Sequence, residues 1–137
     1  MIHRGACHCG AVRFTVRLTD GIETARRCTC SYCAMRGSVA VSARLDDIAV
    51  LQGEDNLTRY TFNTGAAQHF FCRICGIYTH HRRRSKPDEY GVNLACLDGH
   101  GPFLPVVPVM DGQQHPRDTG VSRIAGHLRF ERVEDNA

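Results

Sequence analysis

The sequence CHCG at positions 7–10 determines the fold expected for this 137-residue chain, and it has a counterpart in FCRICG at 71–76. Two cysteines separated by one or two residues lie on a tight turn that directs both sulfur atoms at one point. A following glycine permits the left-handed backbone that such a turn often needs. Each pair supplies two of the four ligands of a closed structural zinc site. We therefore predict that one zinc site joins the two segments, with the ligands Cys7, Cys9, Cys72 and Cys75.

A third cluster, CTCSYC at 28–33, supplies three more cysteines on a short turn that enters a helix: Cys28, Cys30 and Cys33. Three protein ligands with an open fourth position are typical of a catalytic zinc. Zinc is thiophilic, so the expected occupant of that position is the thiolate of a small molecule. A ligand from within the chain would instead close the site, and the candidates are His69, His80, His81 and Cys96. An iron–sulfur cluster is the alternative metal group, although the chain lacks the long cysteine run usual for one.

The four candidates for a closing ligand differ in their chemistry. His80 and His81 are adjacent, and adjacent residues of a strand face opposite sides, so at most one of them can point at a given site. Cys96, in NLACLDG, lies in an apolar stretch that we interpret as strand. A lone thiol in such a place is usually a small buried hydrophobic group. We therefore assign none of these residues as the fourth ligand.

Composition indicates a single β-rich domain that spans residues 1–137. The chain has 13 glycines, no tryptophan and 7% aromatic residues, which favours short strands and turns over long packed helices. Neither a secretory leader nor a run of 18 apolar residues is present, so we expect a cytoplasmic protein without a membrane span. Thiols stay reduced in the cytosol, which favours metal ligation over disulfides. The net charge of +3 makes a nucleic-acid partner unlikely, and the oligomeric state cannot be inferred from these features.

Apolar and polar residues alternate with the period of a half-buried strand in 11–18, where Val12, Phe14, Val16 and Leu18 form one face. Further short strands are expected at 38–45, 57–62, 68–71, 77–81, 90–97 and 127–133. The proline-rich segment 98–120 is expected to be an ordered covering loop with a short strand at 106–110. Helix is expected at 31–36, ending at Gly37, with a second candidate at 45–48.

The stretch HHRRRSKPDEYG at 80–91 concentrates positive charge soon after Cys75. A solvated loop is the ordinary interpretation of such a run. Its guanidinium groups are also suited to the carboxylates of a peptide-like ligand, which makes Arg82, Arg84 and Lys86 candidate binding residues. A nucleic-acid patch fits less well, because the run lacks interleaved aromatic residues apart from Tyr78 and Tyr90.

Taken together, these motifs resemble the family of glutathione-dependent formaldehyde-activating enzymes, which includes centromere protein V. The resemblance is carried by GACHCGAVRF at 5–14, CTCSYCAMRGS at 28–38, FFCRICGIYTHHRRRSKPDEYGVNLACLDG at 70–99 and VPVMDGQQHP at 107–116. It implies a mainly β fold, the β-tent, made of short antiparallel strands with zinc-ribbon-like cysteine knuckles and minimal helix. It also implies a structural zinc at Cys7, Cys9, Cys72 and Cys75 and an active-site zinc at Cys28, Cys30 and Cys33.

The activity implied by the resemblance is that of a carbon–sulfur lyase that forms or cleaves S-(hydroxymethyl)glutathione. The expected partners are therefore a small-molecule thiol, with glutathione as co-substrate, and an aldehyde. Arg82, Arg84 and Lys86 would then contact the carboxylates of glutathione. The alternative function is a non-catalytic, zinc-stabilised binding module for a small thiol or a protein partner. An open position at the three-cysteine site separates the two, because catalysis requires it.

Overall fold

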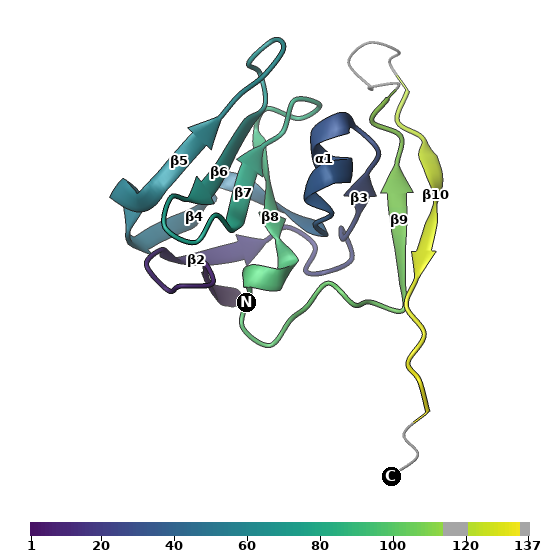
Figure 1. The fold of residues 1–137 in the computed structure, drawn as a ribbon, viewed down its shortest axis with the longest axis horizontal. Coiled ribbons are helices and arrows are strands. Elements are labelled where there is room, and N and C mark those ends of the chain that lie inside the picture. The colour runs from purple at the N-terminus through teal and green to yellow at the C-terminus, as the bar shows by residue number, and fades with distance from the viewer. Residues whose placement is uncertain (114–120, 135–137) are drawn as a thin grey trace.

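The computed structural model describes residues 1–113 and 121–134, and it is built mainly from antiparallel strands (Figure 1). Seven strands form one sheet in the order β1-β2-β4-β8-β7-β6-β5. Their bounds are Ile2–Ala6 (β1), Arg13–Leu18 (β2), Ala40–Gln52 (β4), Glu89–Asn93 (β8), Tyr78–Arg82 (β7), Gln68–Cys72 (β6) and Leu57–Tyr60 (β5). Each neighbouring pair in this sheet is antiparallel, which confirms the predicted mainly β class.

Alternation of side chains explains the central strands. In β2, Phe14, Val16 and Leu18 are buried while Arg13 and Arg17 are exposed, as the period of two requires. The long strand β4 pairs with β8 through its first residues and with β2 through the rest. The register between β2 and β4 shifts twice along this ladder, and such irregularities bend a sheet. We therefore expect a local bend of the sheet where β2 pairs with β4.

A second sheet has three strands in the order β10-β9-β3, with bounds Ile124–Arg129, Val106–Met110 and Arg27–Cys28. The pair β3 and β9 is parallel, and β9 and β10 are antiparallel. Helix α1, Ser31–Arg36, lies between the two sheets (Figure 1). It ends where Gly37 adopts the left-handed conformation, with φ 66°, and its N–H donates to the carbonyl of Cys33. The predicted helix and its glycine stop are confirmed.

Several predicted boundaries were wrong. The candidate helix at 45–48 lies inside β4, because Ile48 and Val50 pair with Val16 and Phe14 and the ladder prevails over local helix propensity. The strand predicted for 90–97 ends at Asn93, whose side chain accepts from the N–H of Ala95 and begins the 3₁₀ turn Leu94–Cys96. Another 3₁₀ turn, Glu54–Asn56, precedes β5.

Other predictions hold in part. The strand predicted for 106–110 is β9, while the part of the covering loop at 114–120 lies outside the described residues. The last strand runs over Ile124–Arg129 instead of 127–133, and the strand at 57–62 ends at Tyr60. Strands β1 and β3 were not predicted. β3 has two residues, too few for any periodic pattern.

The interior contains two hydrophobic clusters. The larger cluster is centred on the strand residues Phe14, Val16, Val41 and Val92, which are at most 2% exposed. The smaller one consists of Cys7, Val12 and Cys72, with Ala11, Leu57 and Cys75 packed against it. Cysteines from the predicted four-cysteine site therefore make up half of the second cluster, which ties that site to the stability of the fold.

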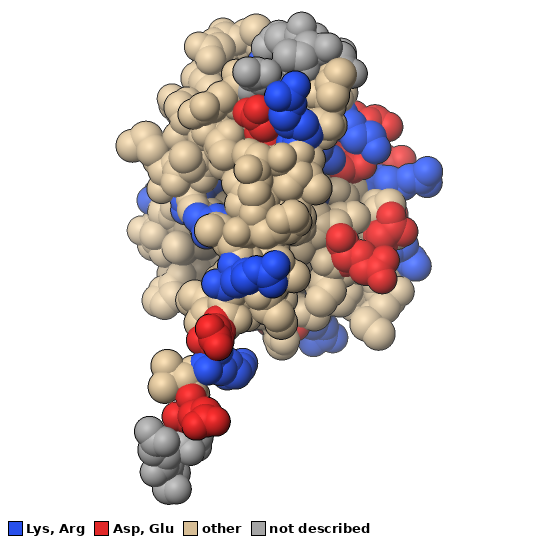
Figure 2. All heavy atoms as spheres, turned by 90° about the vertical axis from the view of Figure 1, so that its right-hand side faces the viewer, with Lys and Arg blue, Asp and Glu red and all other residues tan. Residues whose placement is uncertain are grey.

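The surface over β9 and β10 carries positive and negative side chains that are interspersed over a largely uncharged area (Figure 2). A nucleic-acid-binding surface normally concentrates positive charge. This face, where the two signs are mixed, does not. Among the helices that the structure describes, none has the length and apolar character needed to cross a membrane.

His80, on β7, provides a test of how burial sets the pH dependence of stability. It is 6% exposed, and burial lowers its pKa to about 4, while the same group in the unfolded chain titrates near 6.5. The unfolded chain therefore binds more protons between these values, and stability falls as the pH drops from 6.5 to 4. At pH 5 this difference amounts to about 2 kcal/mol. We expect urea unfolding of the variant His80→Asn to lose this part of the pH dependence.

Every other pH-dependent contribution to stability is common to both proteins, so the difference between the two pH curves isolates His80. Asparagine retains a polar group near Nδ1, which lies 2.9 Å from Thr79 Oγ1. Parallel curves for wild type and variant between pH 7 and pH 5 would show that His80 is free to take a proton in the folded protein.

Candidate functional site

Two tight turns bring four cysteines together. Cys7 and Cys9 lie between β1 and β2, and Cys72 and Cys75 lie at the end of β6 and in the turn that leads to β7. Both turns end at a glycine with positive φ, 79° at Gly10 and 76° at Gly76. The Gly10 N–H donates to the carbonyl of Cys7, and the Gly76 N–H donates to that of Cys72. The predicted role of these two glycines is confirmed by their conformation.

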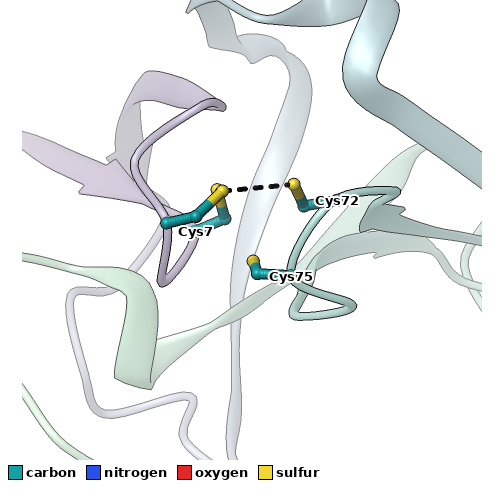
Figure 3. A group of neighbouring side chains, drawn as sticks. Cys7, Cys72 and Cys75 are labelled. Carbon is teal, nitrogen blue, oxygen red and sulfur yellow. Dashed lines mark hydrogen bonds between the residues drawn. The ribbon is translucent and has the colours of Figure 1, made fainter.

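The four sulfur atoms of this group have the spacing of a zinc site. All lie within 4.8 Å of one another. The sulfurs of Cys7 and Cys9 are 3.6 Å apart, and those of Cys9 and Cys72 are 3.7 Å apart. A tetrahedron with zinc–sulfur distances of 2.3 Å has sulfur–sulfur edges of about 3.8 Å. The labelled side chains Cys7, Cys72 and Cys75 point toward a common centre from the two turns (Figure 3). This group can hold a metal ion, and the donor set fits zinc.

Backbone amides also donate hydrogen bonds to two of these sulfurs. The Val12 N–H donates to Cys7 Sγ over 3.3 Å, and the Ile74 N–H donates to Cys72 Sγ over 3.4 Å. Hydrogen bonds to a thiolate stabilise the charged form, which is the form that binds a metal. The turns therefore position the sulfurs, and hydrogen bonds from the backbone N–H groups of Cys75 and Ile74 lower the pKa of Cys72.

The remaining cluster lies where β3 meets α1. Cys28 ends β3, Cys30 caps the N-terminus of α1, and Cys33 lies in its first turn. The three sulfur atoms lie within 4.8 Å of one another. The Cys30 N–H donates to Cys28 Sγ over 3.4 Å, and the Cys33 N–H donates to Cys30 Sγ over 3.3 Å. Hydrogen bonds from Cys28 and Cys33 lower the pKa of Cys30 from its usual value. The group can hold a metal ion through three thiolates.

Gly112 closes one side of this cluster. Its N–H donates to Thr29 Oγ1 over 3.0 Å, which holds the segment after β9 against the cysteine turn. A Cβ atom at position 112 would overlap Cys28 Sγ and come within 2.9 Å of the Cys30 side chain. Glycine therefore lets the backbone approach the sulfurs as closely as it does.

The four candidates for a closing ligand lie outside the three-sulfur group, within the part of the chain that the structure describes. His69 and His81 line the cavity beside the cysteines, whereas His80 lines a separate groove with Phe70 and Tyr90. The expectation that His80 and His81 face opposite sides is thus confirmed. Cys96 is buried, and its Sγ donates to the carbonyl of Tyr78 over 3.4 Å. Burial raises the pKa of Cys96 to about 12, so it behaves as an inert thiol.

The three-cysteine cluster opens into a cavity of about 590 Å³, which lies within the usual size range of small-molecule sites. Its walls are strongly cationic. Asp111 is the one carboxylate among the described lining residues, and the cationic side chains are Arg26, Arg27, Arg36, Arg83, Arg84 and Lys86. Such a lining favours an anionic ligand.

The structure divides the arginine-rich run. Arg84 and Lys86 line the cavity, as does Arg83, which pairs with Glu89. Arg82 is absent from the described lining, and its Nε donates to the carbonyl of Pro87 over 2.7 Å. Lys86 also lies 3.3 Å from a carboxylate oxygen of Glu89.

Arg36 connects the cysteine cluster to the neighbouring rings. Its NH2 donates to Cys33 Sγ over 3.6 Å, and its NH1 donates to His69 Nδ1 over 2.9 Å. The guanidinium carbon lies 3.7 Å from the centre of the Tyr78 ring and 4.8 Å from that of Tyr32. Arg36 therefore places a fixed positive charge beside the sulfur of Cys33.

Sequence reasoning did not single out Arg26, Arg27, Arg36 or Phe62 as residues of the cavity. For Arg36 a signal was present, because it follows Cys33 by three residues on the predicted helix and so shares its face. Arg26 and Arg27 directly precede Cys28, but the direction in which their side chains point depends on the strand β3. Phe62 comes from a loop after β5 that no local pattern connects to the cysteines.

Comparisons with known proteins agree with this arrangement. The family model "Glutathione-dependent formaldehyde-activating enzyme" matches residues 2–111. A crystal structure of a protein from Rhodobacter sphaeroides is similar to this chain, with 57% sequence identity and a TM-score of 0.71. The match covers 72% of this chain and 91% of the other. The matched residues include both cysteine groups, so the resemblance predicted from the motifs is confirmed. The chain belongs to the family of glutathione-dependent formaldehyde-activating enzymes.

Proposed function

We propose that this protein is a zinc-dependent carbon–sulfur lyase that forms or cleaves S-(hydroxymethyl)glutathione. The observation that carries the proposal is the position of the three-sulfur cluster at the wall of a cationic cavity of about 590 Å³. Cys28, Cys30 and Cys33 would hold the zinc associated with activity. The group of Cys7, Cys9, Cys72 and Cys75 would hold a structural zinc within a single domain of residues 1–137.

Zinc held by three thiolates would supply a Lewis acid that lowers the pKa of a fourth, substrate thiol. The three cysteines present their sulfurs on one turn, and Arg36 offsets part of their negative charge through its contact with Cys33 Sγ. Arg84 and Lys86 would bind glutathione carboxylates, as both line the cavity. Arg82 would act from outside the described lining by shaping the loop, through its bond to Pro87.

The overall reaction joins two small molecules. The S–H bond of glutathione breaks, its sulfur forms a bond to the carbon of formaldehyde, and the carbonyl oxygen gains a proton. Such additions are already facile in water, so the task of the protein is to position the thiol and to keep it ionised. The cytosol, where glutathione is abundant and thiols stay reduced, remains the expected location.

The variant Cys30→Ser provides a direct test. Cys30 lies between the other two ligands and receives the Cys33 N–H bond, so its loss should empty the three-cysteine site. We expect native mass spectrometry to count two zinc ions on the wild type and one on the variant. A glutathione adduct should form on the wild type and be absent from the variant, with at least a tenfold loss of catalysed thiol–aldehyde exchange.

The matched control is Cys96→Ser, which removes a buried thiol outside both cysteine groups. It should retain two zinc ions and the adduct. Equal exchange rates for Cys30→Ser and wild type would refute the proposed mechanism. Two zinc ions in the wild type with no adduct and no catalysed exchange would favour the alternative, a zinc-stabilised module that binds a small thiol or a protein partner without catalysis.

A further inference from the structure

His69, a residue of β6, is buried in the wall of the cavity beside the cysteine cluster. Its side chain is 4% exposed, and the cavity that it lines also contains Cys28, Cys30 and Cys33. The ring stacks among Tyr32, Phe62 and His81, with centroid distances of 4.5, 5.8 and 5.2 Å. These contacts fix the plane of the imidazole.

Arg36 determines which nitrogen of His69 carries the proton. A guanidinium has donors and no acceptor, and its NH1 lies 2.9 Å from His69 Nδ1. Nδ1 must therefore accept, which places the single proton of the neutral ring on Nε2. Burial and the adjacent Arg36 lower the pKa of His69 to about 4, so the ring is neutral near pH 7.

The Nε2–H group has no hydrogen-bond partner among the described residues, although it is buried. An unpaired buried donor costs free energy and calls for an explanation. Arg36 also donates to Cys33 Sγ, so one guanidinium holds both the histidine and a proposed metal ligand. One guanidinium therefore links His69 to Cys33, and both residues line the same cavity.

We propose that His69 is a catalytic residue whose Nε2–H donates a hydrogen bond to the oxygen of the aldehyde as the carbon–sulfur bond forms. This inference rests on the proposed function. As the thiolate attacks the carbon, the π electrons of the carbonyl move to the oxygen, which gains negative charge. A fixed neutral donor stabilises that charge without reorganisation. His69 keeps its own proton, and the oxygen takes from solvent the proton that the thiol released.

The same bond acts in the reverse direction. When S-(hydroxymethyl)glutathione is cleaved, the hydroxyl loses its proton to solvent, and His69 stabilises the resulting alkoxide until the carbon–sulfur bond breaks. A histidine that acted as a proton donor would need to be charged at neutral pH. The buried position beside Arg36 disfavours that form, so hydrogen bonding is the role that the surroundings of His69 permit.

Two substitutions distinguish hydrogen-bond donation by His69 Nε2–H from a role of His69 in packing alone. Glutamine places an amide N–H near the Nε2 position, whereas asparagine reaches only the Nδ1 position and keeps the bond to Arg36. We expect His69→Asn to reduce the catalysed exchange of ¹³C-formaldehyde with glutathione about 100-fold, and His69→Gln to retain most of it. KM for glutathione and the zinc count should be unchanged in both. His80→Asn is the matched control, because it alters a buried histidine that lines the other groove.

A second readout uses the zinc-loaded wild-type protein with ¹⁵N-labelled histidine. The Nε2–H signal of His69 should move downfield when glutathione and formaldehyde are added together, and stay in place with glutathione alone. Catalysed exchange in wild type with an equal rate in His69→Asn would overturn the role of His69 and leave the proposed function intact. If wild type shows no catalysed exchange, the proposed function fails; a signal shift then still supports the donor, and an unmoved signal overturns it.

Discussion

Replacing Cys72 by serine is expected to remove one zinc ion and to lower the free energy of unfolding by about 4 kcal/mol or more. Cys72 is fully buried, and its sulfur lies 3.7 Å from Cys9 Sγ across the two turns. With three ligands left, the turn of Cys7 and Cys9 is no longer joined to the end of β6. A midpoint about 15 °C lower is expected in thermal unfolding followed by circular dichroism.

The control for this variant is Cys96→Ser, in which a thiol of similar burial is changed without loss of a ligand. Its midpoint should fall by a few degrees, since one buried thiol changes and no metal is released. Zinc content measured on both proteins completes the comparison. Two zinc ions on Cys72→Ser, with a midpoint equal to that of Cys96→Ser, would show that metal binding by the four-cysteine group does not stabilise this fold.

Both cysteine groups could be predicted from sequence because the relevant geometry is local. A CxC or CxxC turn followed by glycine determines where two sulfurs point, and counting to four ligands then pairs Cys7 and Cys9 with Cys72 and Cys75. The two turns are distant in the sequence, and they could be paired because a closed zinc site needs four donors. The strand β2 was predicted for a similar reason, because its alternation is complete over Arg13–Leu18.

The cavity could not be predicted in the same way. Arg26, Arg36, Phe62 and His69 reach it from four different elements or loops, and no spacing in the chain relates them. The tautomer of His69 depends on one contact with Arg36, which exists only once α1 packs against β6. For Arg82 the sequence suggested a ligand contact because of its charge. In the structure its side chain instead donates to the carbonyl of Pro87 in its own loop.

Gly53 is a further residue whose importance depends on a distant contact. It precedes the turn Glu54–Asn56 with φ 79°, and a Cβ atom there would overlap the backbone carbonyl of Ala11. Ala11 follows the turn of Cys7 and Cys9, so the backbone at the end of this turn packs directly against Gly53. Backbone atoms cannot rotate away as a side chain does, and one of the two segments must shift.

The variant Gly53→Ala is therefore expected to lose about 3 kcal/mol of stability, of which about 1 kcal/mol reflects the positive φ alone. Gly99→Ala is the matched control, because Gly99 has φ 77° and nothing within 4 Å of its Cβ position. The excess over this control measures the clash with Ala11. Displacement of Ala11 also disturbs the bond from the Val12 N–H to Cys7 Sγ, so Gly53→Ala should release zinc to a chelator faster than Gly99→Ala. Equal stability and equal release in the two variants would mean that the turn at Gly53 moves freely away from the N-terminal cysteines.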